Sequence, residues 1–250
     1  MTDGVFDAYS SYYDILYRDK DYSAEIDYIA DLLRHYGVLG ANVLEFGSGT
    51  GKHGRLLAER GYQVTGIERS AEMVARAKSA PGFVCQQGDI CTVQLERTFD
   101  AVLSLFHVVS YQTTNGAVRD VLARAAEHLR SGGLFVFDVW YSPAVQAQRP
   151  EVRVKRLMDG SYEIIRLAEP VSHPNENRVD VNYTIFARDL RSDAVKTFSE
   201  THPMRHFSLP ELALLAENTG FEIVGSEEFL TGNAPSEKTW GVCFILRKVV

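Results

Sequence analysis

The stretch Glu45-Phe46-Gly47-Ser48-Gly49-Thr50-Gly51 decides how the rest of the sequence is interpreted. It ends an apolar run at residues 42–46, which is typical of a buried parallel strand, and it precedes a helical pattern at residues 54–60. Glycines in such a turn let the backbone approach a ligand where a Cβ would clash. The following helix directs its N-terminal amides at that ligand. A tight turn without any ligand would use the same glycines, so the loop alone leaves both interpretations open.

Acidic residues at the ends of the next two predicted strands favour the ligand-binding interpretation. Glu68 ends a strand at residues 62–67, where an acid binds a ribose diol in mononucleotide-binding folds. Asp89 follows a strand at residues 83–87, where a carboxylate can accept a hydrogen bond from an adenine amino group. Each acid alone could be an exposed strand end, but their register on successive strands points to a nucleotide. Directly after the strand the loop reads G-x-G-x-G, whereas a dinucleotide fingerprint has G-x-G-x-x-G, and the sequence has no phosphate-binding G-x-x-x-x-G-K-[ST] loop.

The alternation of strands and helices predicts an α/β fold with a mostly parallel sheet. Residues 131–133, Ser-Gly-Gly, are expected to end a helix before the strand at residues 134–138 begins. From residue 152 to residue 204 the pattern changes to four alternating runs, typical of antiparallel strands with one wet face. The remaining predicted helices cover residues 22–36, 70–79, 116–130 and 209–219, and the remaining strands cover residues 99–105, 221–229 and 240–246.

Composition limits the class of protein. A chain of 250 residues, at about 150 residues per domain, suits either one large domain or one domain with an insertion. The net charge is -7 and the basic residues are scattered, which disfavours a nucleic-acid substrate. No apolar run approaches the ~18 residues of a membrane span, and residues 1–10 lack a signal-peptide pattern. Cys85, Cys91 and Cys243 show no metal-type spacing and favour a reducing, cytoplasmic location, and no metal site is predicted.

With these motifs the chain resembles the class I S-adenosylmethionine-dependent methyltransferases. The resemblance rests on residues 43–51, Glu68, Gly88-Asp89, residues 99–102 and residues 129–134. It implies a Rossmann-like, seven-stranded, mostly parallel sheet flanked by helices, with its last strand antiparallel. Together with the change of pattern, it predicts a small antiparallel β insert after the fifth strand. The expected domains are a cofactor-binding domain at 1–139 and 206–250, with a tyrosine-rich N-terminal lid, and a substrate subdomain at 140–205.

The resemblance implies S-adenosyl-L-methionine as cofactor and assigns residues to it. Glu68 would hold both ribose hydroxyls, Asp89 the adenine amino group, and the backbone carbonyl near Leu105 the methionine ammonium. Met73 and Ile90 would pack against the adenine faces, and the three glycines would line the methionine and ribose. The complete predicted cofactor set is Tyr22, Glu45, Gly47, Gly49, Gly51, Glu68, Met73, Asp89, Ile90 and Leu105.

Two segments are candidates for the acceptor side. The tyrosine-rich residues 12–22 predict a helix packed on the sheet, whereas the resemblance to the small-molecule members of the family implies a lid over the cofactor. His107 and Tyr111 follow the fourth strand, whose carboxyl end faces the ligand in an open α/β sheet, although His107 could equally be a buried, hydrogen-bonded ring.

More narrowly, the chain resembles the sugar-nucleotide N-methyltransferases that dimethylate dTDP-linked deoxyaminosugars. By this resemblance Tyr111 approaches the acceptor amine and the inserted strands carry His202, so the catalytic candidates are Tyr111, His107, His202 and Tyr13. Lys238 stands near a family arginine, which puts a diphosphate contact there in doubt. The matching stretches are Tyr13-Asp14, residues 20–22, residues 104–111, residues 138–143, residues 200–202, Phe207 and Pro235-Ser236.

The predicted reaction is N-methylation of a nucleotide-linked deoxyaminosugar, a small-molecule acceptor. An alternative is O-methylation of a sugar or another small metabolite, which would need a real base such as His107 or His202. A further alternative is a cofactor-binding protein without turnover. No nucleic acid or membrane partner is expected, and the chain would act as a monomer or a homodimer.

Overall fold

The computed structural model describes residues 10–249, apart from the side chains of Ser10, Ser11 and Asp14. Expectations about residues 1–9, and about the Asp14 side chain, therefore lie outside the described residues. No helix of residues 10–249 combines the length and the apolar character needed to cross a membrane.

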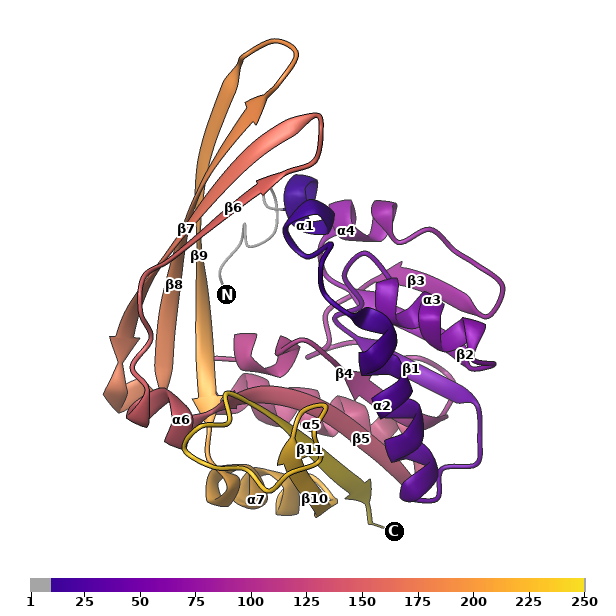
Figure 1. Ribbon diagram of the computed structural model, residues 1–250. Helices are drawn as coiled ribbons and strands as arrows, with labels where there is room; N and C mark the ends of the chain where they lie inside the picture. Colours follow the sequence, from indigo (N-terminus) through magenta and orange to yellow (C-terminus); the bar gives the residue numbers. More distant parts are fainter. Residues whose placement is uncertain (1–9, 250) are drawn as a thin grey trace.

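The main sheet has seven strands in the order β3-β2-β1-β4-β5-β11-β10 (Figure 1). Strands β1 to β5 are parallel, whereas β11 runs antiparallel to both of its neighbours. The expected α/β sheet with an antiparallel last strand is confirmed. The strands are β1 (Asn42–Phe46), β2 (Gln63–Glu68), β3 (Phe83–Gln87), β4 (Phe99–Ser104), β5 (Leu129–Tyr141), β10 (Phe221–Glu228) and β11 (Gly241–Lys248).

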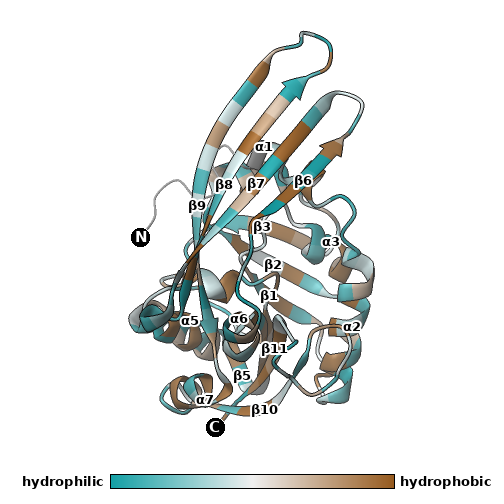
Figure 2. Cartoon of the chain, turned by 60° about the vertical axis from the view of Figure 1, so that its left-hand side comes forward, coloured by the Kyte–Doolittle hydropathy of each residue, from teal (hydrophilic) through white to brown (hydrophobic). Residues whose placement is uncertain are grey.

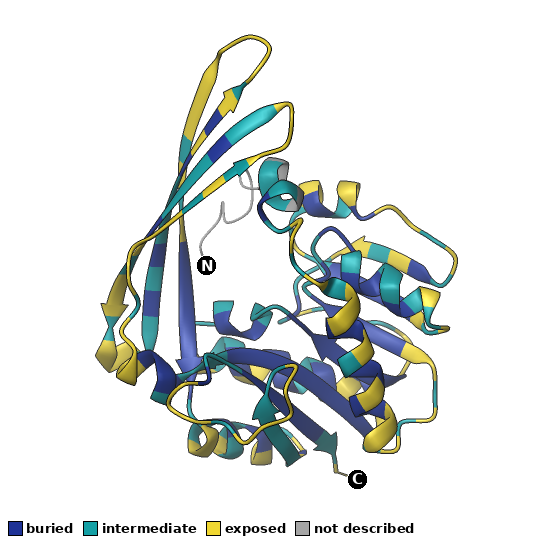
Figure 3. Ribbon diagram, in the orientation of Figure 1, coloured by how far each residue is buried: buried dark blue, intermediate teal, exposed yellow. Residues whose placement is uncertain are grey.

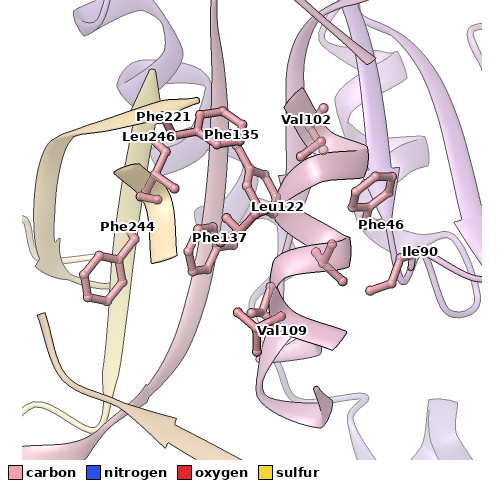
Figure 4. Packing of buried hydrophobic residues seen from close by; sticks show 14 of the residues in the cluster. Phe46, Ile90, Val102, Val109, Leu122, Phe135, Phe137, Phe221, Phe244 and Leu246 are labelled. Atoms are coloured by element: carbon pink, nitrogen blue, oxygen red, sulfur yellow. The ribbon is translucent and has the colours of Figure 1, made fainter. Parts of the chain in front are cut away.

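Helices cover both faces of this sheet because successive side chains of a strand point to opposite sides. On one face Phe135 and Phe137 of β5 pack against Leu122 (Figure 4), and on the other face Val136 packs with Ile29. Helices α5 (Asn115–His128) and α7 (Leu209–Glu217) supply the first face, and α2 (Tyr22–His35) and α3 (Lys52–Glu59) the second. The short α4 (Ala71–Arg76) begins after Ser70, whose side chain accepts a hydrogen bond from Met73 N, as an N-cap does.

The prediction that residues 131–133 end a helix was wrong. Helix α5 ends at His128 and β5 begins at once at Leu129, so these residues lie in the first part of the strand. The register of β5 against β4 shifts between Phe99 and Ala101. Gly132 has φ +74°, and a Cβ on Gly133 would lie 3.1 Å from the Asp100 carbonyl oxygen. The glycines therefore permit an irregularity inside a strand rather than a break before it.

A second, antiparallel sheet is inserted after β5, as expected, and stands beside the parallel sheet (Figure 1). Hydrophobic and hydrophilic residues alternate along its strands (Figure 2), and the far end of the β8–β9 hairpin is largely exposed (Figure 3). Its strands are β6 (Arg153–Met158), β7 (Tyr162–His173), β8 (Arg178–Asp189) and β9 (Val195–Phe207), preceded by α6 (Ser142–Ala147) and with η2 (Pro174–Glu176) between β7 and β8.

The inserted sheet is joined to the main sheet by its last strand. Trp140 and Tyr141 at the end of β5 pair in parallel with His206 and Phe207 at the end of β9. Ser142 adds a 2.7 Å hydrogen bond between its Oγ and Nδ1 of His206. The insertion was expected to begin at residue 140 and to end at residue 205. Strand β5 continues to Tyr141 and strand β9 to Phe207, so both strands cross these boundaries.

We expect Phe137→Ala to lower the free energy of unfolding by about 3–5 kcal/mol, because Phe137 is fully buried and stacked on Phe244. Urea unfolding followed by circular dichroism measures the loss. Val154→Ala on the exposed surface of β6 is the control and should change stability by less than about 0.5 kcal/mol. Equal small effects of both changes would contradict the assignment of Phe137 to the core.

Candidate functional site

One cavity of about 980 Å³ opens at the carboxyl ends of the parallel strands. Its wall includes the glycine loop, Glu68 and Asp89 from the main domain, and Tyr183 and His202 from the inserted sheet. Ligand pockets in proteins usually measure about 300–1,000 Å³, so this cavity has room for a cofactor and an acceptor together. The two parts of the chain therefore build a single site.

The glycine loop presents bare backbone to the cavity. Gly47 has φ +71°, and a Cβ there would lie 2.5 Å from the Val108 side chain. Gly49 has φ +55° and faces open space, where a ligand can approach its peptide. Gly51 lies further back, as the N-cap of α3, and a Cβ on it would lie 2.7 Å from the Phe83 ring. Gly47 and Gly49 line the cavity, whereas Gly51 shapes the start of the helix.

Glu68 is held in place by backbone amides. Its Oε2 accepts a 3.0 Å hydrogen bond from Gly49 N and its Oε1 a 2.8 Å bond from Ser70 N. Burial raises the pKa of this carboxyl, and the two amide bonds oppose that shift. The carboxylate thus sits at the cavity wall with its position set by both neighbouring loops, ready to accept hydrogen bonds from a diol.

Four more predicted cofactor residues line the cavity, namely Met73 of α4, Asp89 and Ile90 after β3, and Leu105 after β4. Asp89 lines the cavity, and its Oδ1 accepts a 2.8 Å hydrogen bond from Cys91 N. Met73, Ile90 and Leu105 also line it and are buried, as apolar contacts to a flat ring require. The structure therefore brings these four residues together at one wall.

Behind the loop lies a buried network that sequence analysis did not predict. Glu45 is buried, accepts a 2.6 Å hydrogen bond from Ser48 Oγ, and its Oε1 lies 3.9 Å from His53 Nδ1. The other ring nitrogen of His53 lies 2.7 Å from Glu25 Oε2, which also pairs with Lys20. Burial raises the pKa of Glu45. At Glu25 burial also opposes ionisation, but His53 and Lys20 bring its pKa below the usual value. Glu45 thus supports the loop from behind and does not line the cavity.

The tyrosine-rich segment packs on the inserted sheet and also faces the cavity. Leu16, at the end of α1 (Ser10–Leu16), is fully buried against Ile164 and Ile185 of the inserted sheet. Lys155 Nζ donates a 2.6 Å hydrogen bond to the Leu16 carbonyl oxygen. On the cavity side lie Tyr13, Tyr17 and Tyr22. The segment is therefore packed on the inserted sheet, and the lid over the cofactor stays a prediction.

His107 follows β4 in a strained backbone conformation. Phe106 and His107 have φ +69° and +62°, which side chains with a Cβ rarely adopt and which cluster at functional sites. His107 Nδ1 lies 2.6 Å from Oδ2 of the buried Asp138, and His107 N donates to the same oxygen at 3.1 Å. Burial alone would raise the pKa of Asp138, but His107 brings it below its usual value. The imidazole is thus held by Asp138 while its ring lines the cavity.

Tyr111 and His202 meet across the two sheets. Tyr111, in the 3-10 turn η1 (Val108–Tyr111), has its Oη 2.9 Å from His202 Nδ1 of β9. His202 Nε2 lies 3.3 Å from Glu200 Oε2, and the Tyr183 ring packs edge-on against the imidazole at 4.9 Å. Burial raises the pKa of Tyr111 well above 10.0. Two residues 91 positions apart in sequence are therefore hydrogen-bonded in the cavity wall.

Several functional residues were not predicted from the sequence. Tyr183, Arg178 and Phe106 line the cavity, and Asp138 and Glu200 orient the two histidines. Asp138 ends an apolar run at the edge where ligands bind, a signal that could have found it. Tyr183 carries no such signal, because only the pairing of β8 with β9 brings it beside His202. Among residues 10–249, no three His, Cys, Asp or Glu side chains gather as a metal site would need.

Comparisons with known proteins agree with this geometry. Residues 43–133 match the methyltransferase domain family. The chain is 30% identical over 223 residues to dTDP-3-amino-3,4,6-trideoxy-alpha-D-glucopyranose N,N-dimethyltransferase of Streptomyces venezuelae, covering 88% of this chain and 91% of the relative. The chain belongs to the S-adenosylmethionine-dependent methyltransferases. The predicted family and cofactor are thereby confirmed.

Two solved structures resemble this methyltransferase over its whole length. CalS10, a SAM-bound amino pentose methyltransferase from Micromonospora echinaspora, is 25% identical, with a TM-score of 0.77 and full coverage of both chains. DesVI from Streptomyces venezuelae is 26% identical, with a TM-score of 0.80 and again full coverage of both chains. The inserted sheet is thus part of the shared architecture, since the alignments span the whole methyltransferase.

Removal of the His107 imidazole tests the pairing with Asp138. In the wild-type protein the depressed pKa of Asp138 adds stability above pH 3.8, which is lost as the pH falls through the folded-state pKa. His107→Leu leaves a buried carboxylate without its imidazole partner, so it should cost about 3 kcal/mol near neutral pH and much less once the pH lies below the folded-state pKa of Asp138. Urea unfolding of the wild-type protein and the variant, near pH 7 and at the low pH, measures the loss of unfolding free energy under each condition.

Asp138→Asn in the His107→Leu background provides the matched control. The amide carries no charge, so the double variant should recover part of the stability at neutral pH and lose the pH dependence. A loss that is the same at both pH values would show that His107 contributes through packing alone.

Proposed function

We propose that this methyltransferase methylates the amino group of a nucleotide-linked deoxyaminosugar, with dTDP as the nucleotide. The observation that carries the proposal is that one cavity holds both kinds of residue. Glu68 and Asp89 are acids of the type that bind a nucleoside, and Tyr111, Tyr183 and His202 are available to an acceptor. The S. venezuelae relative and a 28% identical relative from Streptomyces fradiae are both named as dTDP-aminosugar N,N-dimethyltransferases.

The residues present fit S-adenosylmethionine. Gly49 leaves open space beside its peptide, and Glu68 is fixed with its carboxylate at the cavity wall. The bound cofactor supplies an electrophilic sulfonium methyl group. We assign Glu68 to the ribose hydroxyls, Asp89 to the adenine amino group and the Leu105 carbonyl to the methionine ammonium. Met73 and Ile90 contact the adenine faces, and Gly47, Gly49 and Tyr22 border the methionine and ribose, with Glu45 and Gly51 supporting the loop from behind.

On the acceptor side the residues position an amine and exclude water. Positioning and desolvation supply most of the rate in such a displacement. We assign Tyr111 and Tyr13 to contacts with the amino group, with His202 behind Tyr111 and His107 at the wall near Trp140. A neutral amine attacks without a strong base, so the side chains orient it and move its proton.

The proposal extends to the organisation of the chain. Residues 140–205 serve as a substrate subdomain, and residues 1–139 and 206–250 as the cofactor domain. The methyltransferase works on a small molecule in the cytoplasm, where free Cys85, Cys91 and Cys243 stay reduced. It is a monomer or a homodimer, which light scattering on the purified protein distinguishes.

Glu68→Gln should weaken S-adenosylmethionine binding by about tenfold to a hundredfold, because a charged acceptor of two hydroxyl groups is lost. Burial raises the pKa of Glu68 above 4.5, so acidification protonates this carboxylate before the pH reaches 4.5. The affinity of the wild-type protein for S-adenosylmethionine should therefore already decrease at a pH above 4.5, and the affinity of the variant should not show this decrease. Isothermal titration calorimetry measures both. Glu59→Gln, on the exposed end of α3, is the control. Unchanged binding in the Glu68 variant would refute the assignment.

The acceptor class is tested with dTDP-3-amino-3,4,6-trideoxyglucose, the compound in the name of the S. venezuelae relative. We expect mass spectrometry to show one or two added methyl groups after incubation with S-adenosylmethionine. The corresponding dTDP-sugar with a hydroxyl in place of the amine is the control and should remain unmodified. Methylation of the hydroxyl sugar alone would favour an O-methyltransferase, and no methylation across a panel of dTDP-aminosugars would reject the proposal.

A further inference from the structure

The contact between Tyr111 and His202 is part of a longer chain of polar groups. Glu200 and His202 point to the same side of β9, since they are two residues apart in a strand. Their side chains are nearly buried, at 8% and 3% exposed. From Glu200 Oε2 to His202 Nε2 is 3.3 Å, and from His202 Nδ1 to Tyr111 Oη is 2.9 Å. This chain runs from the inserted sheet to a phenol in the cavity wall of the main domain.

The chemistry of the groups gives the chain a direction. A carboxylate only accepts hydrogen bonds, so Glu200 requires a proton on His202 Nε2. In a neutral imidazole Nδ1 is then the acceptor, and Tyr111 donates its hydroxyl proton to it. Glu200 therefore selects the tautomer that lets His202 receive a proton from the cavity side.

We propose that Tyr111, His202 and Glu200 form a proton relay that deprotonates the acceptor ammonium before methyl transfer. The inference rests on the proposed function. Aliphatic amines of the lysine type have a pKa of about 10, so an amine reaches the site mainly as an ammonium ion with no lone pair for attack. A proton that leaves the ammonium beside the buried His202 needs a path through the cavity wall.

The steps balance as follows. The N–H bond of the ammonium breaks, its electron pair stays on nitrogen, and the proton goes to Tyr111 Oη. The former Tyr111 hydroxyl proton moves to His202 Nδ1, so the acceptor has lost one proton and His202 has gained one. The resulting imidazolium keeps its Nε2 proton facing the Glu200 carboxylate, which stabilises the positive charge. Tyr111 is the catalytic residue of this relay, and Glu200 is a positioning residue.

The surroundings keep the proton from stopping on Tyr111. Burial raises the pKa of Tyr111, and the neighbouring Tyr183, Tyr17, Glu200 and Glu68 add to that shift, so the phenol stays neutral except in transit. Around the His202 ring, Tyr111 faces it from η1, Tyr183 from β8 and Glu200 from its own strand. The other strand beside β8 is β7, and its Arg166 places its guanidinium 5.1 Å from the centre of the Tyr183 ring.

Histidine NMR tests the relay without turnover. In protein labelled with ¹³C in its histidine rings, addition of dTDP-3-amino-3,4,6-trideoxyglucose should move the His202 signal to the imidazolium position. The dTDP-sugar with a hydroxyl in place of the amine should leave it unchanged, and Tyr111→Phe should abolish the response. No movement of the wild-type signal with the bound aminosugar would overturn the relay.

Kinetics distinguish a proton role from a structural one. Glu200→Gln and His202→Gln should each lower kcat on the order of 10²-fold near neutral pH, and the deficit should shrink as the pH rises toward the amine pKa. Thr201→Val is the matched control, because the exposed Thr201 lies between them in β9 and donates its hydroxyl proton to Asn182 Oδ1. A deficit in kcat that is equal at every pH, or no deficit, overturns the relay.

The same assay separates failure of the relay from failure of the proposed function. If the wild-type protein methylates no aminosugar, the proposed function fails and the relay fails with it. If the wild-type protein methylates an aminosugar and both variants have the same kcat as the wild type, only the relay fails.

Discussion

The site depends on one short strand pairing. Trp140 and Tyr141 of β5 pair with His206 and Phe207 of β9, and the Ser142 to His206 hydrogen bond follows directly. Because β9 leaves the main sheet beside the carboxyl end of β5, the rest of the inserted sheet has to stand next to the cofactor end of the parallel strands (Figure 1). His202, four residues before His206, is thereby placed against Tyr111.

The N-terminal segment shows how this constraint spreads. Leu16 contributes its buried side chain to a cluster with the inserted sheet, and Arg18 donates a 2.9 Å hydrogen bond to the Met158 carbonyl. The next residues turn back to the main domain, where Lys20 pairs with Glu25 and Glu25 with His53. The segment therefore contacts the inserted sheet at one end and, through Lys20 and Glu25, helix α3 of the main domain at the other.

Two carboxyls at and near the cavity have pKa values shifted in opposite directions. Glu68, held by two backbone amides, has a pKa raised by burial, whereas Asp138, beside an imidazole, has a lowered one. Both carboxyls are buried, so the opposite directions of their pKa shifts come from their different hydrogen-bond partners and not from different burial. A carboxylate held by amides suits neutral hydroxyls, and an imidazole held by a carboxylate keeps one tautomer and one orientation.

Much of the fold and of the cofactor side could be predicted from the sequence. The glycine loop, Glu68 and Asp89 are local signals, because each lies within a few residues of the strand that positions it. The beginning of β5 could not be predicted, since Gly132 and Gly133 serve an irregularity next to Asp100 that has no signature in the sequence. Predictions for the catalytic residues named Tyr111 and His202 separately, without their contact or their link to Glu200.

What the sequence by itself determined is the order of strands and helices, the place of the insertion and the residues at the ends of β1, β2 and β3. These follow from periodicity and turn chemistry, which act over short distances along the chain. Only the tertiary structure decided which residues meet across the cavity. The hydrogen bond between Tyr111 and His202 spans 91 residues. It exists because β9 pairs with β5, a contact whose free energy comes from packing and burial between distant segments and leaves no local pattern to recognise.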